Sequence, residues 1–269
     1  MKYIATFIIC FVLVWATPLQ KSPLKKVPAK DIDSRIIDGD LAVLGQFPWQ
    51  VALYITHAST IQFRCSGSII SEQWILTTAS NIYGFDSVTV VAGVVDLNGS
   101  GVLTQSSEVI PYYDFNPPKN VVHNIGLIRL STPLTFNRYV AAITLADNLL
   151  EDGADVTISG WGATSSHSDD DSTQHLYYAD LVTIRNSECS AIYGNILEST
   201  VVCAGPGTDS VKNACYDDSG DPLVLDVNTN PVHVGLLSSL GSLNCESGIP
   251  SGFIRTAFFR NWIRDVTGV

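Results

Sequence analysis

The stretch CYDDSGDPLVL, from Cys215 to Leu225, places one serine, Ser219, between a pair of aspartates and a Gly-Asp-Pro sequence. Glycine and proline are strong local turn signals, because glycine tolerates positive φ angles and proline fixes φ. The apolar run PLVL that follows is typical of a buried strand. The stretch therefore predicts a tight turn that presents a serine and leads into a strand, and such a serine is a candidate nucleophile.

Short runs rich in β-branched and aromatic residues recur from Trp49 to about Ile254, for example WQVALYI, SVTVVAGVV, VGLLSSL and SGFIRT. Clusters of Gly, Pro, Asn, Asp and Ser separate them, which is typical of an all-β sandwich or barrel. Helical periodicity is clear only at the end of the chain, in four apolar residues spaced i, i+3, i+4 and i+7: Phe259, Trp262, Ile263 and Val266. We expect β-structure with one C-terminal helix packed on it.

The chain has 269 residues, of which 46% are apolar, so it can bury a sizeable core. Residues 1–16, MKYIATFIICFVLVWA, combine a lysine, an apolar run and small residues at Val14 and Ala16, which predicts a secretory signal peptide. The run is short for a membrane span, which needs about 20 residues, and no later segment is long and apolar enough. We therefore expect a secreted, soluble protein.

Residues 17–35, TPLQKSPLKKVPAKDIDSR, hold three prolines, five basic and two acidic residues, a composition typical of a flexible basic leader. Once Lys2 and these leader residues are set aside, nine basic and twenty-four acidic side chains remain from Ile36 onward. This acidic balance disfavours nucleic acid and anionic membranes as partners, because phosphate groups are bound by clustered Lys and Arg.

Six cysteines are present, and Cys10 falls within the predicted signal peptide. The remaining five are an odd number, so at least one is expected outside any intramolecular disulfide. No C-x-x-C or H-x-x-H pair occurs, so we expect no metal site and no cofactor. The acidic run of residues 165–174 is interpreted as a solvated loop rather than a calcium site, because it lacks the interleaved ligand spacing of calcium loops. Asn98 begins a predicted N-glycosylation sequon in a turn.

Five local patterns follow one another along the chain: RIIDGD at Arg35, CSGSIISEQWILTTASN at Cys65, HNIGLIRL at His123, ISGWG at Ile158 and CYDDSGDPLVL at Cys215. Together they resemble the chymotrypsin-like serine proteases, whose corresponding patterns read R-I-V-G-G, C-G-G-S-L-I-x-x-x-W-V-L-T-A-A-H-C, x-D-I-A-L-I-x-L, V-S-G-W-G and C-x-G-D-S-G-G-P-L-V. The closing CESGIPSGFIRTAFFRNWI is most similar to arthropod chymotrypsin-type members.

This resemblance spans residues 35–265 and implies an all-β fold of two six-stranded antiparallel β-barrels, with the active site between them and a C-terminal α-helix. Residues 36–269 would form this trypsin-like domain. The resemblance also implies two disulfides, Cys189–Cys203 and Cys215–Cys245. Cys65 matches one half of a third disulfide, but Asn81 stands at the position of its partner. We expect Cys65 to be a small buried free thiol, and a bridge to a second chain is the alternative.

In this family a serine hydroxyl, a weak nucleophile alone, gives its proton to a histidine that a buried aspartate orients. By the resemblance, Ser219 holds the nucleophile position, Ser80 the histidine position and Asn124 the aspartate position. A hydroxyl has no accessible basic form near pH 7 and a carboxamide has no charge, so neither can fill the missing role. The sequence gives no reason to expect that a histidine elsewhere in the chain reaches Ser219. The histidines considered are His57, His123, His167, His175 and His233.

The family's oxyanion hole consists of backbone N–H groups, which by the resemblance belong here to Ser219 and Asp217. Asp217 and Asp221 both stand where the family has glycine. A side chain at position 217 restricts a backbone that glycine leaves free, and its carboxylate would oppose the developing negative charge. We expect the oxyanion hole to be impaired.

The substrate pocket also departs from the family pattern. Asn213 stands at the floor, where trypsin-like members carry aspartate, and Leu240 stands where many members have a glycine that opens the rim. We expect a narrowed pocket and weakened peptide binding. The candidate pocket residues are Asn213, Ser238, Ser239, Leu240 and Ser251.

Part of the activation machinery is retained. Arg35 precedes Ile36 as at a family activation site, and Asp218 keeps the carboxylate that pairs with the new amino terminus after cleavage. Asp38 replaces a glycine of that motif. The alternative is that Asp218 caps a turn.

We therefore expect a secreted, monomeric serine protease homologue that is catalytically inactive. A fold does not by itself imply an activity. Such a homologue would bind an extracellular protease, inhibitor or substrate-like peptide as a decoy or cofactor. The alternative is an active secreted endopeptidase of altered mechanism, which the retained Ser219, Asp218 and activation site favour.

Overall fold

The structure is a computed structural model that describes residues 39–117, 123–162, 173–193, 199–207, 212–215, 218–239 and 247–269. The predicted signal peptide and basic leader lie outside these residues. No helix in the described part of the chain is long and apolar enough to cross a membrane.

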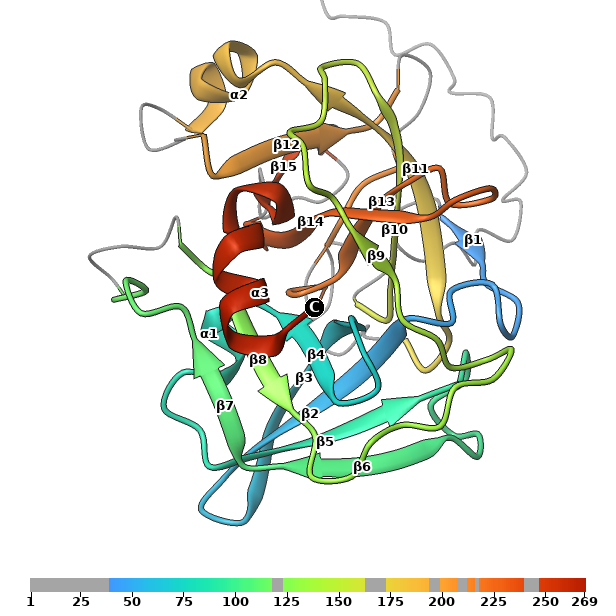
Figure 1. The fold of residues 1–269 in the computed structure, drawn as a ribbon. Coiled ribbons are helices and arrows are strands. Elements are labelled where there is room, and N and C mark those ends of the chain that lie inside the picture. The colour runs from blue at the N-terminus through green and yellow to red at the C-terminus, as the bar shows by residue number, and fades with distance from the viewer. Residues whose placement is uncertain are drawn as a thin grey trace, which may run out of the picture. The chain divides into compact units, whose positions relative to one another are not determined.

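The first half of the described chain forms a sheet of seven antiparallel strands (Figure 1). In sheet order they are β6 (Val102–Ser106), β5 (Ser87–Ala92), β2 (Gln50–His57), β3 (Thr60–Ile69), β4 (Trp74–Thr77), β8 (Gly126–Arg129) and β7 (Glu108–Pro111). The two edge strands, β6 and β7, are separated by a single residue in the sequence. The sheet therefore curls until its two edges meet at this short connection.

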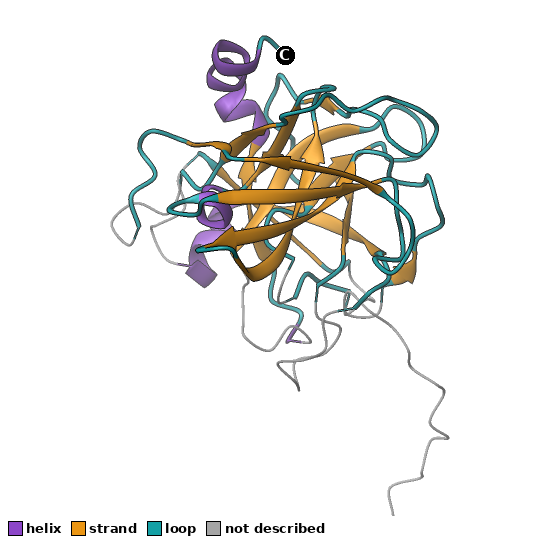
Figure 2. Ribbon diagram, turned by 90° about the horizontal axis from the view of Figure 1, so that it is seen from below, coloured by secondary structure: helices purple, strands orange, loops and turns teal. Residues whose placement is uncertain are grey.

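The second half forms a closed barrel of six antiparallel strands, seen among the orange strands of Figure 2. In barrel order they are β11 (Tyr177–Ile184), β10 (Asp155–Gly160), β13 (Pro222–Leu225), β14 (Val232–Ser239), β15 (Ser251–Arg255) and β12 (Val201–Gly205). The barrel closes because β12 also pairs with β11. Two short strands join it from outside: β1 (Asp40–Leu41), antiparallel to β11, and β9 (Thr144–Leu145), parallel to β14.

Helices occupy three places between and after the strands. They are α1 (Ala79–Ile82), α2 (Asn186–Tyr193) and α3 (Arg260–Thr267), the last preceded by a 3-10 turn, Thr256–Phe259. Phe259 and Ile263 are buried, and Trp262 and Val266 pack against the same core cluster. The predicted fold class is confirmed, and the helix expected from the apolar periodicity is α3.

The side chains of β2 alternate between two environments. Val51 and Leu53 are completely buried in the core of the first sheet. Ala52, between them, belongs to a different cluster that includes Trp161 and Val224 of the second half. Successive side chains of a strand point to opposite faces, so β2 fills the inside of its own sheet and also packs against the barrel. Burial on both faces explains why the residues VALYI of β2 are apolar without alternation.

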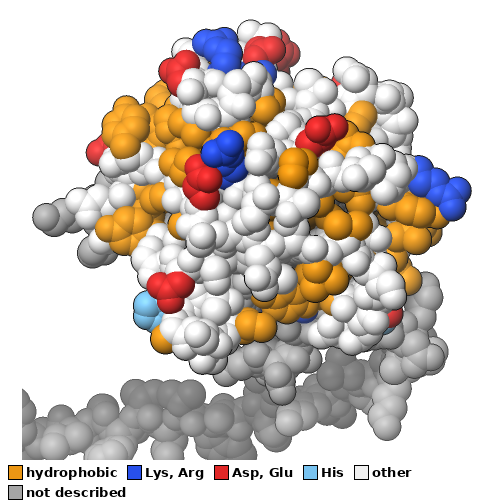
Figure 3. All heavy atoms as spheres, turned by 60° about the horizontal axis from the view of Figure 1, so that its bottom comes forward, with side chains coloured by type: hydrophobic (Ala, Val, Ile, Leu, Met, Phe, Trp, Pro, Cys, Tyr) orange, Lys and Arg blue, Asp and Glu red, His pale blue; other side chains and the backbone are white. Residues whose placement is uncertain are grey.

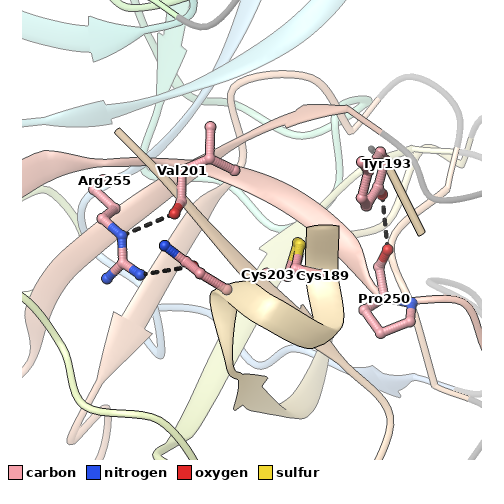
Figure 4. The surroundings of a disulfide bond; sticks show 7 residues. Cys189, Tyr193, Val201, Cys203, Pro250 and Arg255 are labelled. Carbon is pink, nitrogen blue, oxygen red and sulfur yellow. Dashed lines mark hydrogen bonds between the residues drawn. A yellow bond between two sulfur atoms is a disulfide. The ribbon is translucent and has the colours of Figure 1, made fainter. Parts of the chain in front are cut away.

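The disulfide predicted between Cys189 and Cys203 joins α2 to β12 (Figure 4). Two further contacts hold the same region. The Tyr193 hydroxyl donates to the Pro250 carbonyl at 2.7 Å, and the Arg255 guanidinium donates to the side-chain oxygen of Asn186 at 3.1 Å. The disulfide and these side chains fix α2 on the barrel end that carries β12 and β15.

Charged side chains are scattered over the face drawn in Figure 3, where single acidic and basic groups alternate with hydrophobic and polar ones. The Trp74 ring carries the Arg129 guanidinium 5.8 Å from its centroid, and Arg129 also pairs with Glu108. Arg129 thus takes part in two local pairs at the edge of the first sheet.

Candidate functional site

The predicted turn at Ser219 is present, and its backbone is tied to both halves of the fold. Gly220 has φ +86°, a conformation that side chains other than glycine rarely adopt, and a Cβ there would lie 2.2 Å from the Ser66 carbonyl oxygen. The Gly220 N–H donates to the Leu237 carbonyl at 3.0 Å, and the Leu237 N–H donates to the Asp221 carbonyl at 2.8 Å. The glycine is required here by both conformation and space.

On its outer side Ser219 contacts a chain of neutral polar groups. Its hydroxyl lies 3.2 Å from the Thr78 hydroxyl, and the Ser80 hydroxyl donates to Thr78 at 3.3 Å. Asn124 joins the chain through its amide, which donates to the Ser80 hydroxyl at 3.1 Å and to the Ser238 hydroxyl at 3.0 Å. The Asn124 carbonyl in turn accepts the Ser80 N–H at 2.7 Å. The three positions predicted for the triad are therefore brought together.

This arrangement limits what Ser219 can do chemically. A serine becomes a strong nucleophile when a neighbouring base removes its proton. The hydroxyl nearest to it belongs to Thr78, and the next groups are the Ser80 hydroxyl and the Asn124 carboxamide. None of these groups accepts a proton near pH 7. These hydroxyl and amide groups can position a ligand by hydrogen bonds, but none of them can act as a general base.

Thr78 is a site residue that the sequence reasoning missed. It is completely buried and lies at the N-cap of α1, where its side chain makes no capping hydrogen bond. Its hydroxyl is directed instead to Ser219 and Ser80. The signal was visible in the sequence, because TTAS carries a threonine where the family pattern T-A-A-H has alanine.

The described histidines have partners away from Ser219. The nearest acceptors of the ring nitrogens are Asp86 for His57 at 3.4 Å, Asp114 for His123 at 2.9 Å and Asp96 for His175 at 3.7 Å. His233 is completely buried in β14, and its Nδ1 lies 2.7 Å from the Thr256 hydroxyl. Burial lowers the pKa of His233 from 6.5 to about 3, so it is neutral. His167 lies outside the described residues.

Asn81 has a role that the missing disulfide partner did not suggest. Its Nδ2 donates to the Ser219 carbonyl at 3.1 Å and to the Thr77 hydroxyl at 3.2 Å. The Ser219 carbonyl also accepts the Ser66 N–H at 3.1 Å. Asn81 therefore ties the Ser219 turn to the first sheet. Cys65 is 3% exposed inside the core of that sheet, which disfavours a bridge to a second chain.

Two aspartates are buried behind the turn, and neither has any exposed surface. Asp218 accepts the Gly162 N–H on Oδ1 and the Cys215 N–H on Oδ2, each at 2.8 Å. The second contact is the turn cap that we gave as the alternative for Asp218. Ile36 lies outside the described residues, so its pairing with Asp218 stays a prediction.

Asp221 lies against Gln50, which connects it to the barrel. Gln50 Nε2 donates to Asp221 Oδ1 at 3.2 Å, and Gln50 Oε1 accepts the Ser159 hydroxyl at 2.8 Å. Burial, followed by the charge of Asp218, raises the pKa of Asp221 well above its ordinary value of 3.8. Burial and the neighbouring Asp218 therefore favour the protonated, neutral form of Asp221 over its carboxylate.

The predicted pocket floor is occupied by hydrogen bonds within the protein. Asn213 is 2% exposed, and its Nδ2 donates to the Ile249 carbonyl at 2.7 Å. Its Oδ1 accepts the Ala214 N–H at 3.0 Å and the Ser251 hydroxyl at 3.3 Å. An amide that is satisfied in this way has little capacity left to recognise a ligand. Ser239 continues β14, where its backbone is paired with Gly252.

Several predicted site residues fall outside the described residues. Cys215 is disulfide-bonded, whereas its predicted partner is not described. Asn98 is exposed, and its N–H donates to the Asp96 carboxylate at 2.9 Å, which places the sequon in a turn. The residues that are not described are Arg35, Ile36, Asp217, Leu240 and Cys245.

Comparison with known proteins decides the family. The trypsin family model matches residues 36–263. The chain belongs to the trypsin family. Brachyurin of Leptuca pugilator is 32% identical over 238 residues, which cover 87% of this chain and 99% of that protein. Collagenase of Hypoderma lineatum is also 32% identical, over 240 residues that cover 87% of this chain and 88% of that protein.

A solved structure agrees with this assignment. The HL collagenase structure matches with a TM-score of 0.77 and 30% identity, covering 87% of this chain and 99% of that one. The two-part β-structure and the C-terminal helix are thus those of the trypsin family. Against the family pattern, this member carries Ser80, Asn124 and Thr78 around a retained Ser219.

Proposed function

We propose that this chain is a secreted, catalytically inactive member of the trypsin family that acts by binding another extracellular protein. The observation that carries the proposal is the neutral chain from Ser219 through Thr78 and Ser80 to Asn124. In a comparable triad, loss of the base alone lowers turnover by about 10⁶. We expect Asp217 to impair one oxyanion-hole donor, and loss of one such donor lowers turnover by a further factor of about 10² to 10³.

An active endopeptidase is the second candidate function. The retained turn favours it, since Ser219 stands beside Gly220 at φ +86° and next to a buried Asp218. This candidate requires a base that reaches Ser219, and the four described histidines all have partners elsewhere.

A fluorophosphonate probe separates the two candidates. The probe labels a serine only when the hydroxyl is activated, so we expect no labelling of the protein cleaved after Arg35. An active protease of the trypsin family is the positive control, and Ser219→Ala shows whether any labelling occurs at that hydroxyl. Labelling that Ser219→Ala abolishes would overturn the inactive assignment.

Binding remains possible at the same surface. Ser80 is exposed, Ser219 and Ser238 are partly exposed, and their hydroxyls can donate and accept hydrogen bonds. A protein inhibitor of trypsin-family proteases is the probe for this role. We expect the protein to compete for the inhibitor and to restore the activity of an inhibited protease, while Ser219→Trp, which covers this surface, does not. Equal behaviour of both proteins, or no restoration, contradicts a role as an inhibitor-binding decoy.

Secretion is the remaining part of the proposal. Expression of the full chain in eukaryotic cells should release a protein into the medium without residues 1–16, as shown by its amino-terminal sequence. The exposed Asn98 should carry a glycan, so an N-glycosidase should lower the apparent mass of the secreted protein but not of Asn98→Gln. Retention of the protein inside the cell contradicts this part.

A further inference from the structure

The two buried carboxyl groups behind the Ser219 turn, those of Asp218 and Asp221, both lie against Gly160. A Cβ added to Gly160 would lie 1.7 Å from Asp221 Oδ2 and 2.8 Å from Asp218 Oδ1. Both carboxyl groups use space that exists only because position 160 is glycine. Neither group takes part in the proposed function.

The hydrogen bonds assign different protonation states to the two groups. Asp218 accepts two backbone N–H groups at 2.8 Å, which favours its ionised form. Asp221 Oδ1 accepts from Gln50, whereas Asp221 Oδ2 accepts no hydrogen bond from the described residues. An oxygen buried without a donor is unfavourable as part of a carboxylate. The same oxygen as an O–H group can donate to the Asp218 carboxylate.

Two basic groups on neighbouring segments bind elsewhere. The Arg64 guanidinium, on β3, donates to the Trp161 carbonyl at 2.8 Å. Lys212, on the segment before Cys215, pairs with Asp40 at 2.8 Å. Of the groups that influence Asp221 directly, Gln50 and Ser66 are neutral and Asp218 is acidic. Ionisation of Asp221 would therefore place a second negative charge beside Asp218.

We propose that Asp218 and Asp221 share a single proton and that release of this proton is a pH-sensitive switch of the Ser219 turn. While the shared proton is bound, Asp221 is the acid and Asp218 is the carboxylate. Release breaks the Asp221 O–H bond and transfers the proton to water, which leaves two carboxylates in a buried site. Two like charges on neighbouring buried groups repel strongly, as in the paired carboxyl groups of aspartic proteases.

The switch is connected to the outer face of the turn. The Asp221 carbonyl accepts the N–H of Leu237, and the next residue, Ser238, accepts the hydrogen bond of the Asn124 amide at 3.0 Å. Displacement of Asp221 therefore acts on β14 and on the neutral chain around Ser219. Alkaline pH should loosen the turn and the surface proposed for binding.

The sign of the effect follows from proton linkage. The folded protein keeps a proton that the unfolded chain releases above the ordinary carboxyl pKa of 3.8. The stabilising effect of this proton is complete below that pH and is lost as the pH rises through the folded pKa. One linked proton changes the unfolding equilibrium constant by up to about tenfold per pH unit.

The test is denaturant unfolding as a function of pH on the protein that has not been cleaved after Arg35, with Asp221→Asn as the variant. Asparagine has the shape of the neutral acid and cannot ionise, so the variant should lose up to about tenfold per pH unit of the alkaline dependence. Asp226→Asn, which removes an exposed carboxyl group in the turn after β13, should keep the full dependence. An unchanged slope in Asp221→Asn overturns the proposal.

A spectroscopic measurement covers the case in which the variant does not fold. The infrared spectrum of the wild-type protein at neutral pH should contain the carbonyl stretch of a protonated carboxyl group, and this band should disappear at alkaline pH. Local hydrogen exchange at Leu237 and Gly220 should increase over the same pH range, beyond the change in intrinsic exchange rate. Absence of the band at neutral pH overturns the proposal. This readout does not depend on any activity or binding partner.

Discussion

The two sides of the Ser219 turn have opposite chemistry. On the outer side, Ser219 contacts the hydroxyls of Thr78 and Ser80 and, through them, the amide of Asn124. On the inner side, Asp218 and Asp221 have no exposed surface. The outer side, where Ser80 is exposed and Ser219 is partly exposed, is neutral, whereas the completely buried inner side carries the ionisable groups. The comparison separates two properties that the family normally combines, namely the shape of the site and its ability to move protons.

The largest expected effect is on the backbone that both sides share. Gly220→Ala places a Cβ 2.2 Å from the Ser66 carbonyl oxygen at φ +86°, so we expect a loss of about 3 kcal/mol or more in unfolding free energy. Gly84→Ala is the matched control, because Gly84 has φ +80° and no atom within 4 Å of the added Cβ. It should lose only about 1 kcal/mol. Equal losses in chemical denaturation would show that the turn has room for a side chain.

A second prediction adds a proton acceptor to the outer side. Thr78→Ala, Ser80→His and Asn124→Asp together would supply a base and its orienting carboxylate. We still expect turnover of peptides to remain very low, because the family pattern predicts that Asp217 opposes an oxyanion. Adding Asp217→Gly should then raise turnover by about 10²-fold. The two changes should be non-additive, since base and oxyanion hole act together.

Turnover of both variants on one peptide, after cleavage at Arg35, provides the measurement. The same pair should be compared on a small activated ester, which depends less on pocket contacts. A triple variant as fast as an active relative contradicts our interpretation of Asp217.

The third prediction concerns a buried group with the opposite pH response. Burial lowers the pKa of His233 to about 3, so the folded state stays neutral while the unfolded chain takes up a proton below 6.5. Its contribution to stability is present above 6.5 and is lost toward pH 3, by up to about 1.4 kcal/mol per pH unit. His233→Asn, which keeps a polar atom near Thr256, should flatten this acid slope.

His57→Asn is the control for that measurement, because His57 is exposed at the end of β2. It should keep the acid slope of the wild type in thermal or denaturant unfolding. If His233→Asn and the wild type lose stability equally between pH 6 and pH 4, the buried histidine is not the group responsible.

The smallest expected effect is at the contact between the turn and α1. Asn81→Ala removes one donor to the Ser219 carbonyl, which should lower the unfolding free energy by about 1 kcal/mol. The effect is limited because the Ser66 N–H continues to bind the same oxygen. Hydrogen exchange should increase at the turn but not at the distant Cys189–Cys203 disulfide. A loss above about 3 kcal/mol would mean that Asn81 stabilises more than this contact.

Local patterns were sufficient where the physics is local. The glycine in CYDDSGDPLVL predicted a turn that is present, with Gly220 at positive φ. The apolar spacing from Phe259 to Val266 predicted α3. The Cys189–Cys203 disulfide is also formed, but it was implied by the family resemblance and not by a local pattern. The roles assigned to Ser80, Asn124 and Asp217 depend on the family pattern and stay predictions.

The remaining features depend on residues far apart in the sequence, and burial decides them. Ser219 and Thr78 are 141 positions apart, and Gln50 and Asp221 are 171 apart, so no local pattern relates either pair. The sequence by itself determined the strands, the terminal helix, the turn and the absence of a histidine at position 80. Only the tertiary structure decided that Thr78 contacts Ser219, that Asn213 is satisfied within the protein and that Asp221 lies beside Asp218 without solvent. Propensity acts over a few residues, whereas the dielectric surroundings and hydrogen-bond partners of a buried group exist only after distant segments pack together.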